Sequence, residues 1–293
     1  MPAKTYGVIC TKGVVGKTTV TAFTGAILAD MGQRVLLVDA DPQQSLSRVY
    51  PIQAKAPFGL TQLYRNANPE GCISKTSILN LDIIINDDPG GDNGAITNFL
   101  RESFTHIQYL HAALQTICDQ YDYILIDTQG AKGIIQESVI FASDILISPV
   151  QPQILDSREF IHGTVELINK FKPKPGFTSM TGRALPPVKV LINMWDRTVN
   201  ADQVSRYLRS EFDRQIDGYI TVLNTIIPRL KIYAEAAGKR EPVHRHEQAL
   251  ATTTPALVTM MELIYELEPK LIGTEPTWEG MNKKAQGVAE NEK

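Results

Sequence analysis

One segment constrains the fold of this 293-residue chain more than any other: Lys12-Gly13-Val14-Val15-Gly16-Lys17-Thr18-Thr19. It follows a short apolar run at residues 6–10, of the type that forms a buried strand. It precedes residues 19–31, in which apolar side chains recur at helical spacing up to Gly32. A strand, a tight turn and a helix N-terminus bring backbone N–H groups and the positive end of a helix dipole together. The segment therefore predicts a phosphate-binding loop at residues 12–19.

Two side chains of this loop have predicted roles that follow from its geometry. Lys17 places a positive charge near the β- and γ-phosphates of a nucleotide, and the hydroxyl of Thr18 holds Mg²⁺. ATP and Mg²⁺ are therefore the expected ligands. The alternative is a chance turn rich in glycine and lysine.

Buried strands alternate with helical segments along most of the chain. Further apolar runs of strand type lie at residues 33–39, 81–86, 122–127, 144–150, 188–193 and 225–228, and helical spacing occurs at residues 95–119, 157–171 and 201–214. This alternation predicts an α/β fold: a single doubly wound domain over residues 1–272, with a mostly parallel sheet covered by helices on both faces. In such a fold ligands bind at the carboxyl ends of the strands. Residues 273–293 are polar and interrupted by Gly and Pro, which predicts a disordered tail.

Composition narrows the class of protein. An apolar content of 43% is enough for a large core. The cysteines Cys10, Cys72 and Cys118 form no C-x-x-C pair, so neither a disulfide framework nor a cysteine-based metal site is indicated. No apolar run approaches the roughly 18 residues of a membrane span, and the first strand leaves no room for a signal peptide. We therefore expect a cytoplasmic protein.

The phosphate loop resembles the deviant Walker A box, K-G-G-x-G-K-[ST]-[ST], of the ParA/MinD family of P-loop ATPases. In that family the first lysine crosses the interface of a nucleotide-sandwich dimer and touches the partner's phosphates. The resemblance implies this role for Lys12, and it implies an ATP-bound homodimer. Gly13, Val14, Val15, Gly16 and Thr19 would complete the ATP-binding loop.

Two acidic motifs follow in the order that the family shows. Asp39-Ala40-Asp41-Pro42-Gln43 resembles its D-x-D-P-Q segment, in which the second aspartate orients the attacking water and the first supports Mg²⁺ and the loop. These are the roles implied for Asp41 and Asp39; the alternative for Asp41 is a cap on a helix starting near Ser45. Asp127 ends an apolar strand in the Walker B arrangement that holds the hydration shell of Mg²⁺. Gln129 stands where the family commonly has proline.

The last motifs concern the adenine base. Asn193 ends the apolar run 188–193 and resembles the strand-terminal asparagine that hydrogen-bonds adenine, although an asparagine that initiates a turn is the alternative. Residues 226–229 resemble the I-P-R segment of the family, which places Pro228 beside the base. The resemblance extends from about residue 4 to residue 270.

The resemblance implies a function. Members of the ParA branch bind double-stranded DNA non-specifically as ATP dimers, and a ParB-like or other cargo-binding partner stimulates slow hydrolysis and releases them. This cycle moves plasmids, chromosomal origins or other cargo over the nucleoid. Because the loop begins at residue 12, we expect the Soj-like form without an N-terminal helix-turn-helix domain. The C-terminal stretch lacks the basic amphipathic face by which MinD-type members bind membrane.

Basic residues near two predicted helices are candidates for contacts with DNA phosphates. The alternative is that these residues belong to an ordinary solvated surface. The net charge of −3 neither supports nor excludes DNA binding, because a local cluster of basic residues is sufficient to bind DNA. The candidates are Arg206, Arg209, Arg214, Lys231, Lys239 and Arg240.

Val14 is the departure from the family pattern with the greatest consequence, because a phosphate loop normally has glycine there. A β-branched residue tolerates a positive φ poorly, so a strain of ~1–3 kcal/mol is expected if the loop keeps its usual path. We expect impaired hydrolysis or dimer formation relative to a Val14→Gly protein. Two other hypotheses are a nucleotide-gated DNA-binding module without turnover and a positioning ATPase for non-DNA cargo. A third is an amidoligase or a metal-inserting P-loop enzyme, which would need substrate-pocket residues or cysteine pairs; the sequence has no cysteine pairs.

Overall fold

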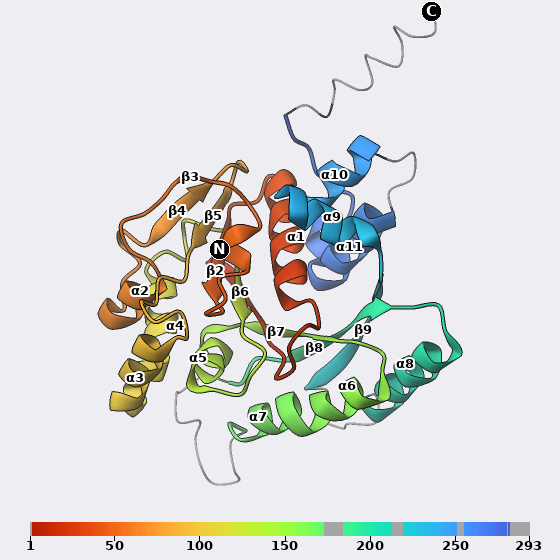
Figure 1. The fold of residues 1–293 in the computed structure, drawn as a ribbon, viewed down its shortest axis with the longest axis horizontal. Helices are drawn as coiled ribbons and strands as arrows, with labels where there is room; N and C mark the ends of the chain where they lie inside the picture. Colours follow the sequence, from red (N-terminus) through yellow and green to blue (C-terminus); the bar gives the residue numbers. More distant parts are fainter. Residues whose placement is uncertain (1, 173–183, 213–218, 251–254, 280, 282–293) are drawn as a thin grey trace, which may run out of the picture.

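A single sheet of nine strands forms the centre of the computed structural model, which describes residues 2–172, 184–212, 219–250, 255–279 and 281 (Figure 1). The strands are arranged in the order β3-β4-β5-β2-β6-β1-β7-β8-β9. Their bounds are β1 Lys4–Val8, β2 Val35–Ala40, β3 Ile52–Ala54, β4 Ile73–Thr76, β5 Leu81–Ile84, β6 Tyr123–Thr128, β7 Ile145–Val150, β8 Val188–Trp195 and β9 Ile220–Pro228.

All pairings from β5 to β9 are parallel, which confirms the predicted doubly wound sheet. The two strands at the other edge, β3 and β4, are antiparallel and were not predicted. They are three and four residues long, and some of their side chains are exposed, so they lack the apolar runs of the buried strands. The sequence pattern that reveals a central strand is absent from such short edge strands.

Helices and short helical turns connect the strands. Their bounds are α1 Lys17–Asp30, η1 Leu46–Arg48, α2 Leu60–Asn66, α3 Gly94–Glu102, η2 Phe104–Gln108, α4 Tyr109–Gln115, α5 Ile134–Ala142, α6 Ile154–Glu159, η3 Phe160–Val165, α7 Glu166–Asn169, α8 Val199–Phe212, α9 Lys231–Lys239, α10 Val243–Leu250, α11 Pro255–Leu267 and η4 Pro269–Leu271.

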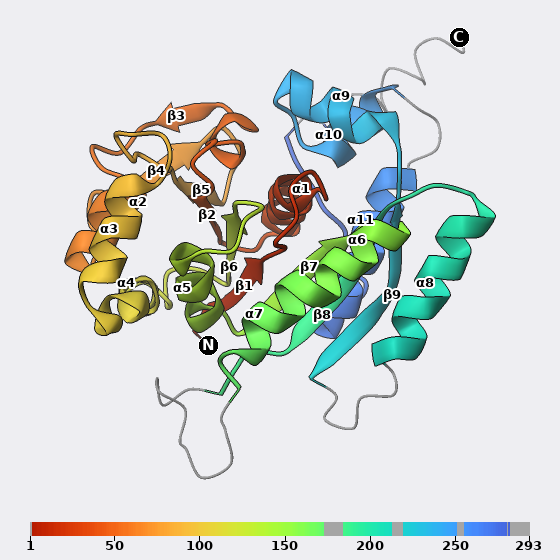
Figure 2. The same ribbon diagram turned by 60° about the horizontal axis from the view of Figure 1, so that its bottom comes forward.

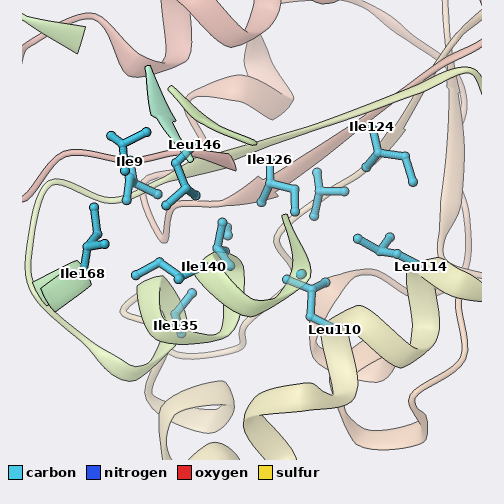
Figure 3. Packing of buried hydrophobic residues seen from close by; sticks show 14 of the residues in the cluster. Ile9, Leu110, Leu114, Ile124, Ile126, Ile135, Ile140, Leu146 and Ile168 are labelled. Atoms are coloured by element: carbon cyan, nitrogen blue, oxygen red, sulfur yellow. The ribbon is translucent and has the colours of Figure 1, made fainter. Parts of the chain in front are cut away.

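Each face of the sheet carries its own apolar core. On one face α2 to α5, η3, α7 and α8 pack against the strands. Figure 3 shows side chains of α4 and α5, among them Leu110 and Ile140, directed toward Ile124 and Ile126 of β6. On the other face α1, α9 and α11 bury residues such as Phe23 of α1. These helices lie beside one another in Figures 1 and 2. Two buried faces explain why the central strands are apolar on both sides.

Two predicted helices have an irregular interior. The segment 95–119 is divided at Ser103, whose φ of −149° and ψ of 139° end α3 before η2 and α4 begin. The segment 157–171 forms a continuous rod, α6–η3–α7, in which Phe160–Val165 is a π-helical turn. Helical spacing of apolar residues persists through such irregularities, so the sequence pattern does not reveal them.

Residues 273–293 were expected to form a disordered tail, but the first of them contact the folded domain. The N–H of Thr277 donates to the carbonyl of Asp30 at 2.7 Å, and Trp278 packs edge-on against His244. The first part of this segment therefore contacts the folded domain, since Trp278 lies against His244 and Arg245 of α10. Disorder of the tail as a whole stays a prediction. Residues 282–293 lie outside the described part of the chain. Over the residues that the structure describes, no helix is long and apolar enough to cross a membrane.

Candidate functional site

The predicted phosphate loop lies between β1 and α1 at the carboxyl edge of the sheet. Gly16 precedes the first helical residue with a φ of 87°, and α1 begins at Lys17. The Lys17 side chain is buried, and its Nζ donates to the carbonyl of Lys12 at 3.0 Å. The ammonium group therefore lies against the start of the loop, next to the N-terminus of α1, where a phosphate is favoured.

Thr18 and Asp127 meet beside this loop. The Thr18 hydroxyl donates to Asp127 Oδ2 at 2.6 Å, although 109 residues separate the two in sequence. Asp39 stands opposite Asp127 in the register of β2 and β6, and both carboxyl groups are fully buried. The structure thus places these three predicted site residues close together, and their role toward Mg²⁺ stays a prediction.

The electrostatics of the two carboxyl groups suit a cation. Burial raises the pKa of Asp39 to about 6, and burial together with the charge of Asp39 raises the pKa of Asp127. Asp127 Oδ1 is buried and has no hydrogen-bond partner. In the described part of the chain, no three His, Cys, Asp or Glu side chains form a complete metal cage. A Mg²⁺ ion held by one or two carboxylates, a hydroxyl and substrate phosphates fits this donor set.

The first aspartate of the Asp39–Asp41 motif is held firmly and the second is more accessible. Asp39 Oδ2 accepts hydrogen bonds from the N–H and the hydroxyl of Ser47 at 2.8 and 2.7 Å. Asp41 is partly exposed, and its Oδ1 accepts from the N–H of Gln43 at 2.9 Å. Neither this bond nor the uncapped start of η1 at Ser45 supports the alternative in which Asp41 caps the next helix. Ser47, in the short turn η1, was missed because nothing near it in the sequence indicates that it bonds Asp39.

Val14 adopts the backbone conformation that its position was predicted to require. Its φ is +60°, its side chain is 87% exposed, and its carbonyl accepts a hydrogen bond from Gln151 Nε2 at 2.7 Å. The loop therefore keeps the left-handed path that glycine would take without strain.

Asn193 contacts the phosphate loop directly. Its Nδ2 donates to the carbonyl of Val15 at 2.7 Å, so this side chain ties β8 to the loop. Asn193 and Pro228 both line a cavity of about 470 Å³. The cavity extends from Thr19 at the start of α1 to Tyr233 of α9, and its volume lies within the range of small-molecule sites. The role of Asn193 toward adenine remains a prediction; the turn-initiating alternative does not explain its long-range bond.

The segment after β6 packs closely against the loop. A Cβ on Gly130 would lie 2.5 Å from Gly13 Cα, so only glycine permits this approach. Gln136, on α5, donates from Nε2 to the carbonyl of Gln129 at 2.9 Å and to that of Cys10 at 3.3 Å. A glutamine side chain thus fixes the position at which the family commonly has proline. Nothing in the sequence pattern indicated Gln136, a buried polar residue in a helix that is itself mostly buried.

The candidate DNA contacts do not form one cluster. Arg206 and Arg209 lie on α8, whereas Lys231 and Lys239 lie on α9, and the two helices are apart in Figures 1 and 2. Arg240 donates to the carbonyls of Arg48 and Tyr50 at 3.1 and 2.9 Å, which gives it a structural role. Lys231 also lines the cavity near Pro228. Arg214 lies outside the described residues, and DNA contact by any of the six remains a prediction.

A cavity of about 500 Å³ at the amino edge of the parallel strands is a weaker candidate for the functional site. Its principal charges neutralise one another, since Asp82 Oδ2 accepts from Lys75 Nζ at 2.6 Å and from the Tyr121 hydroxyl at 2.8 Å. Ligands of doubly wound folds bind at the opposite edge, where the phosphate loop lies.

The chain is similar to several known proteins over much of its length. A family model described as an AAA domain matches residues 3–174. The virulence plasmid ParA family protein pGP5-D of Chlamydia psittaci is 32% identical over 195 residues, 66% of this chain and 70% of that protein. The sporulation initiation inhibitor protein Soj of Bacillus subtilis is 29% identical over 245 residues, 79% of this chain and 87% of Soj. A Cyanothece McdA–ATP complex matches with a TM-score of 0.72 and 23% identity, over 90% of this chain and 95% of that one, which supports the fold alone.

Proposed function

The chain belongs to the ParA/MinD-type P-loop ATPases, and from this membership we propose that it is a DNA partitioning ATPase. In this proposal ATP and Mg²⁺ bind at the carboxyl edge of the sheet, and two chains form a nucleotide-sandwich dimer. The dimer binds double-stranded DNA without sequence preference. A ParB-like or other cargo-bound activator then stimulates slow hydrolysis, which releases the dimer and positions a plasmid, a chromosome or other cargo.

The observation that carries the proposal is the hydrogen bond of 2.6 Å between Thr18 Oγ1 and Asp127 Oδ2. It joins the phosphate loop to the strand end that carries the Walker B aspartate. The buried ammonium of Lys17 lies in the same loop, 3.0 Å from the Lys12 carbonyl. A buried lysine, a threonine hydroxyl and two buried carboxyl groups lie together at the edge where α/β proteins bind ligands. Nucleotide binding explains this combination of charged and polar groups.

The chain's own residues supply most of what phosphoryl transfer to water requires, which is positioning and stabilisation of charge. Lys17 stabilises negative charge on the β- and γ-phosphates, and Lys12 of a second copy adds another positive charge. Asp41, the more accessible carboxylate, orients water toward the γ-phosphate. Thr18, Asp39 and Asp127 hold Mg²⁺, which when bound neutralises charge on the phosphate oxygens.

Base recognition uses the cavity of about 470 Å³ that Asn193 and Pro228 line. Its apolar walls, which include Ile227 and Tyr233, suit the faces of a purine ring. Because Asn193 Nδ2 also bonds the Val15 carbonyl, a base that engages Asn193 is coupled to the phosphate loop.

The test is whether ATP drives both dimerisation and DNA binding. Light scattering after size exclusion should show a dimer with ATP and Mg²⁺ and a monomer with ADP, and a mobility-shift assay should show DNA binding only with ATP. Lys17→Ala should abolish both, and Asp41→Ala should retain the dimer because water attack, not binding, is impaired. DNA binding that is equal with ATP, ADP and no nucleotide would contradict the proposal.

The hydrolysis-impaired DNA-binding module is a second candidate, because Val14 has a positive φ that strains a β-branched residue. This candidate predicts ATP-dependent dimerisation without phosphate release. Turnover by Val14→Gly but not by the natural chain would favour it over the working ATPase.

A further inference from the structure

The π-helical turn Phe160–Val165 contacts the beginning of the phosphate loop. Thr164, in this turn, is completely buried. Its Oγ1 accepts a hydrogen bond from the backbone N–H of Thr11 at 3.1 Å and lies 3.3 Å from the Thr11 hydroxyl. Thr11 immediately precedes Lys12, so this contact fixes the backbone from which the Lys12 side chain departs.

Steric fit reinforces the contact. A Cβ on Gly163 would lie 2.0 Å from Thr11 Oγ1, which is closer than any real contact. The π-helical turn therefore combines a glycine that admits Thr11 with a threonine that binds it. Single turns of this geometry are rare in helices and are frequent at functional sites.

The same turn also touches the segment that follows β6. Lys132 Nζ donates to the carbonyl of His162 at 3.2 Å and to Glu166 at 3.4 Å. The turn thus connects the two chain segments that border the phosphate site, the loop entrance at Thr11 and the stretch after the Walker B strand.

We propose that Thr164 and Gly163 are positioning residues that hold Thr11 so that Lys12 is presented correctly for phosphoryl transfer. The inference rests on the proposed function, because it assigns these residues to the ATPase reaction. Without the Thr164 hydroxyl, the Thr11 N–H is buried without an acceptor, and the loop entrance must shift to reach another partner or water. Neither residue touches substrate in this proposal; both act through the backbone at Lys12.

The first experiment compares Thr164→Val and Thr164→Ser with Thr61→Val as a matched control, because the Thr61 hydroxyl is buried without a partner. Hydrogen exchange at residues 10–16, measured without nucleotide, should accelerate in Thr164→Val only. The kcat for ATP hydrolysis should fall about tenfold in that variant, with KM nearly unchanged, as expected when a buried N–H loses its acceptor. Thr164→Ser should restore most of the rate because it keeps the hydroxyl.

The second experiment combines the changes with Lys12→Ala. If Thr164 acts through Lys12, Thr164→Val should lower kcat little further in the Lys12→Ala background. Gly163→Ala should reproduce the loss of rate, and its melting temperature shows whether folding is intact. Unchanged exchange in Thr164→Val, or fully additive losses in the double variant, would overturn the inference. If the natural chain hydrolyses no ATP, the proposed function fails, and the exchange measurement alone decides whether Thr164 holds the loop.

Discussion

Replacement of Val14 by glycine should separate backbone strain from steric effects at the phosphate loop. A positive φ, here +60°, costs an L-residue about 1–2 kcal/mol. Glycine removes this strain but loses about 0.5–1 kcal/mol through the greater freedom of the unfolded chain. Little burial is lost, because the valine side chain is 87% exposed. We therefore expect a net gain between about 0 and 1.5 kcal/mol, which corresponds to a melting temperature at most about 3 °C higher.

Nucleotide affinity should change less than the strain suggests. Val14 holds its positive φ within the folded structure itself, so the strain lowers folding stability and is not a step of ATP binding. The Kd of the monomer for ATP should shift by less than about threefold, or ~0.6 kcal/mol. In the proposed dimer Lys12 reaches a second copy, and we expect the exposed Val14 side chain to crowd that interface because the two residues are only two positions apart in sequence. Relief of such crowding, worth about 1–3 kcal/mol, should tighten the ATP-dependent dimer about tenfold or more.

Three assays check these expectations: thermal unfolding, titration of ATP at low protein concentration, and sedimentation with ATP and Mg²⁺. Ala67→Gly is the matched control, because Ala67 has a φ of +48° at the end of α2. It should raise the melting temperature similarly and leave dimerisation unchanged. A tenfold gain in ATP affinity without a change in melting temperature would refute the assignment of the strain to folding. Equal dimerisation and equal turnover in both proteins would refute crowding by Val14.

Three other predictions concern single side chains. Thr18→Val should lower ATP turnover by about a hundredfold, since it removes a metal-binding hydroxyl, whereas Thr18→Ser should retain most of it; phosphate release distinguishes them. Asn193→Ala should weaken ATP binding about tenfold by freeing the Val15 carbonyl and the base contact, measured by calorimetry; an unchanged Kd would contradict this. Burial lowers the pKa of His244. Burial would raise the pKa of Asp30, but the hydrogen bonds that Asp30 accepts from His244 and Arg245 outweigh it and lower that pKa. Below about pH 6.5 the unfolded chain then binds more protons, so the free energy of unfolding should fall as the pH falls, more steeply in the natural protein than in His244→Gln.

The sequence predicted the parts of the site that are contiguous motifs. The phosphate loop follows β1, and Asp39 and Asp127 are the penultimate residues of the apolar strands β2 and β6. The parallel topology then brings these strand ends to one edge of the sheet. The positive φ at residue 14 followed from the loop pattern alone. The positions of these features could be predicted because a central parallel strand is a continuous apolar run and the polar or glycine-rich residues at its end stand out in the sequence.

The sequence did not predict contacts that depend on distant elements. Ser47, Gln136 and Thr164 each bond the site from outside its motifs, and nothing local distinguishes them from ordinary loop or helix residues. The contacts of Trp278 with His244 and Arg245 also require the folded C-terminal helices. Such polar residues contact the site only because tertiary packing brings distant elements together. The periodicity of apolar residues in the sequence does not reveal which elements meet.

Phosphate release by the purified protein, with ATP and Mg²⁺ and with or without non-specific double-stranded DNA, decides whether the chain is a working partition ATPase. Lys17→Ala is the control, since it removes the buried charge of the phosphate loop. We expect slow turnover that DNA stimulates and that Lys17→Ala abolishes. An absence of turnover in both the natural chain and Val14→Gly, with DNA present, would contradict the assignment of this chain as a working partition ATPase.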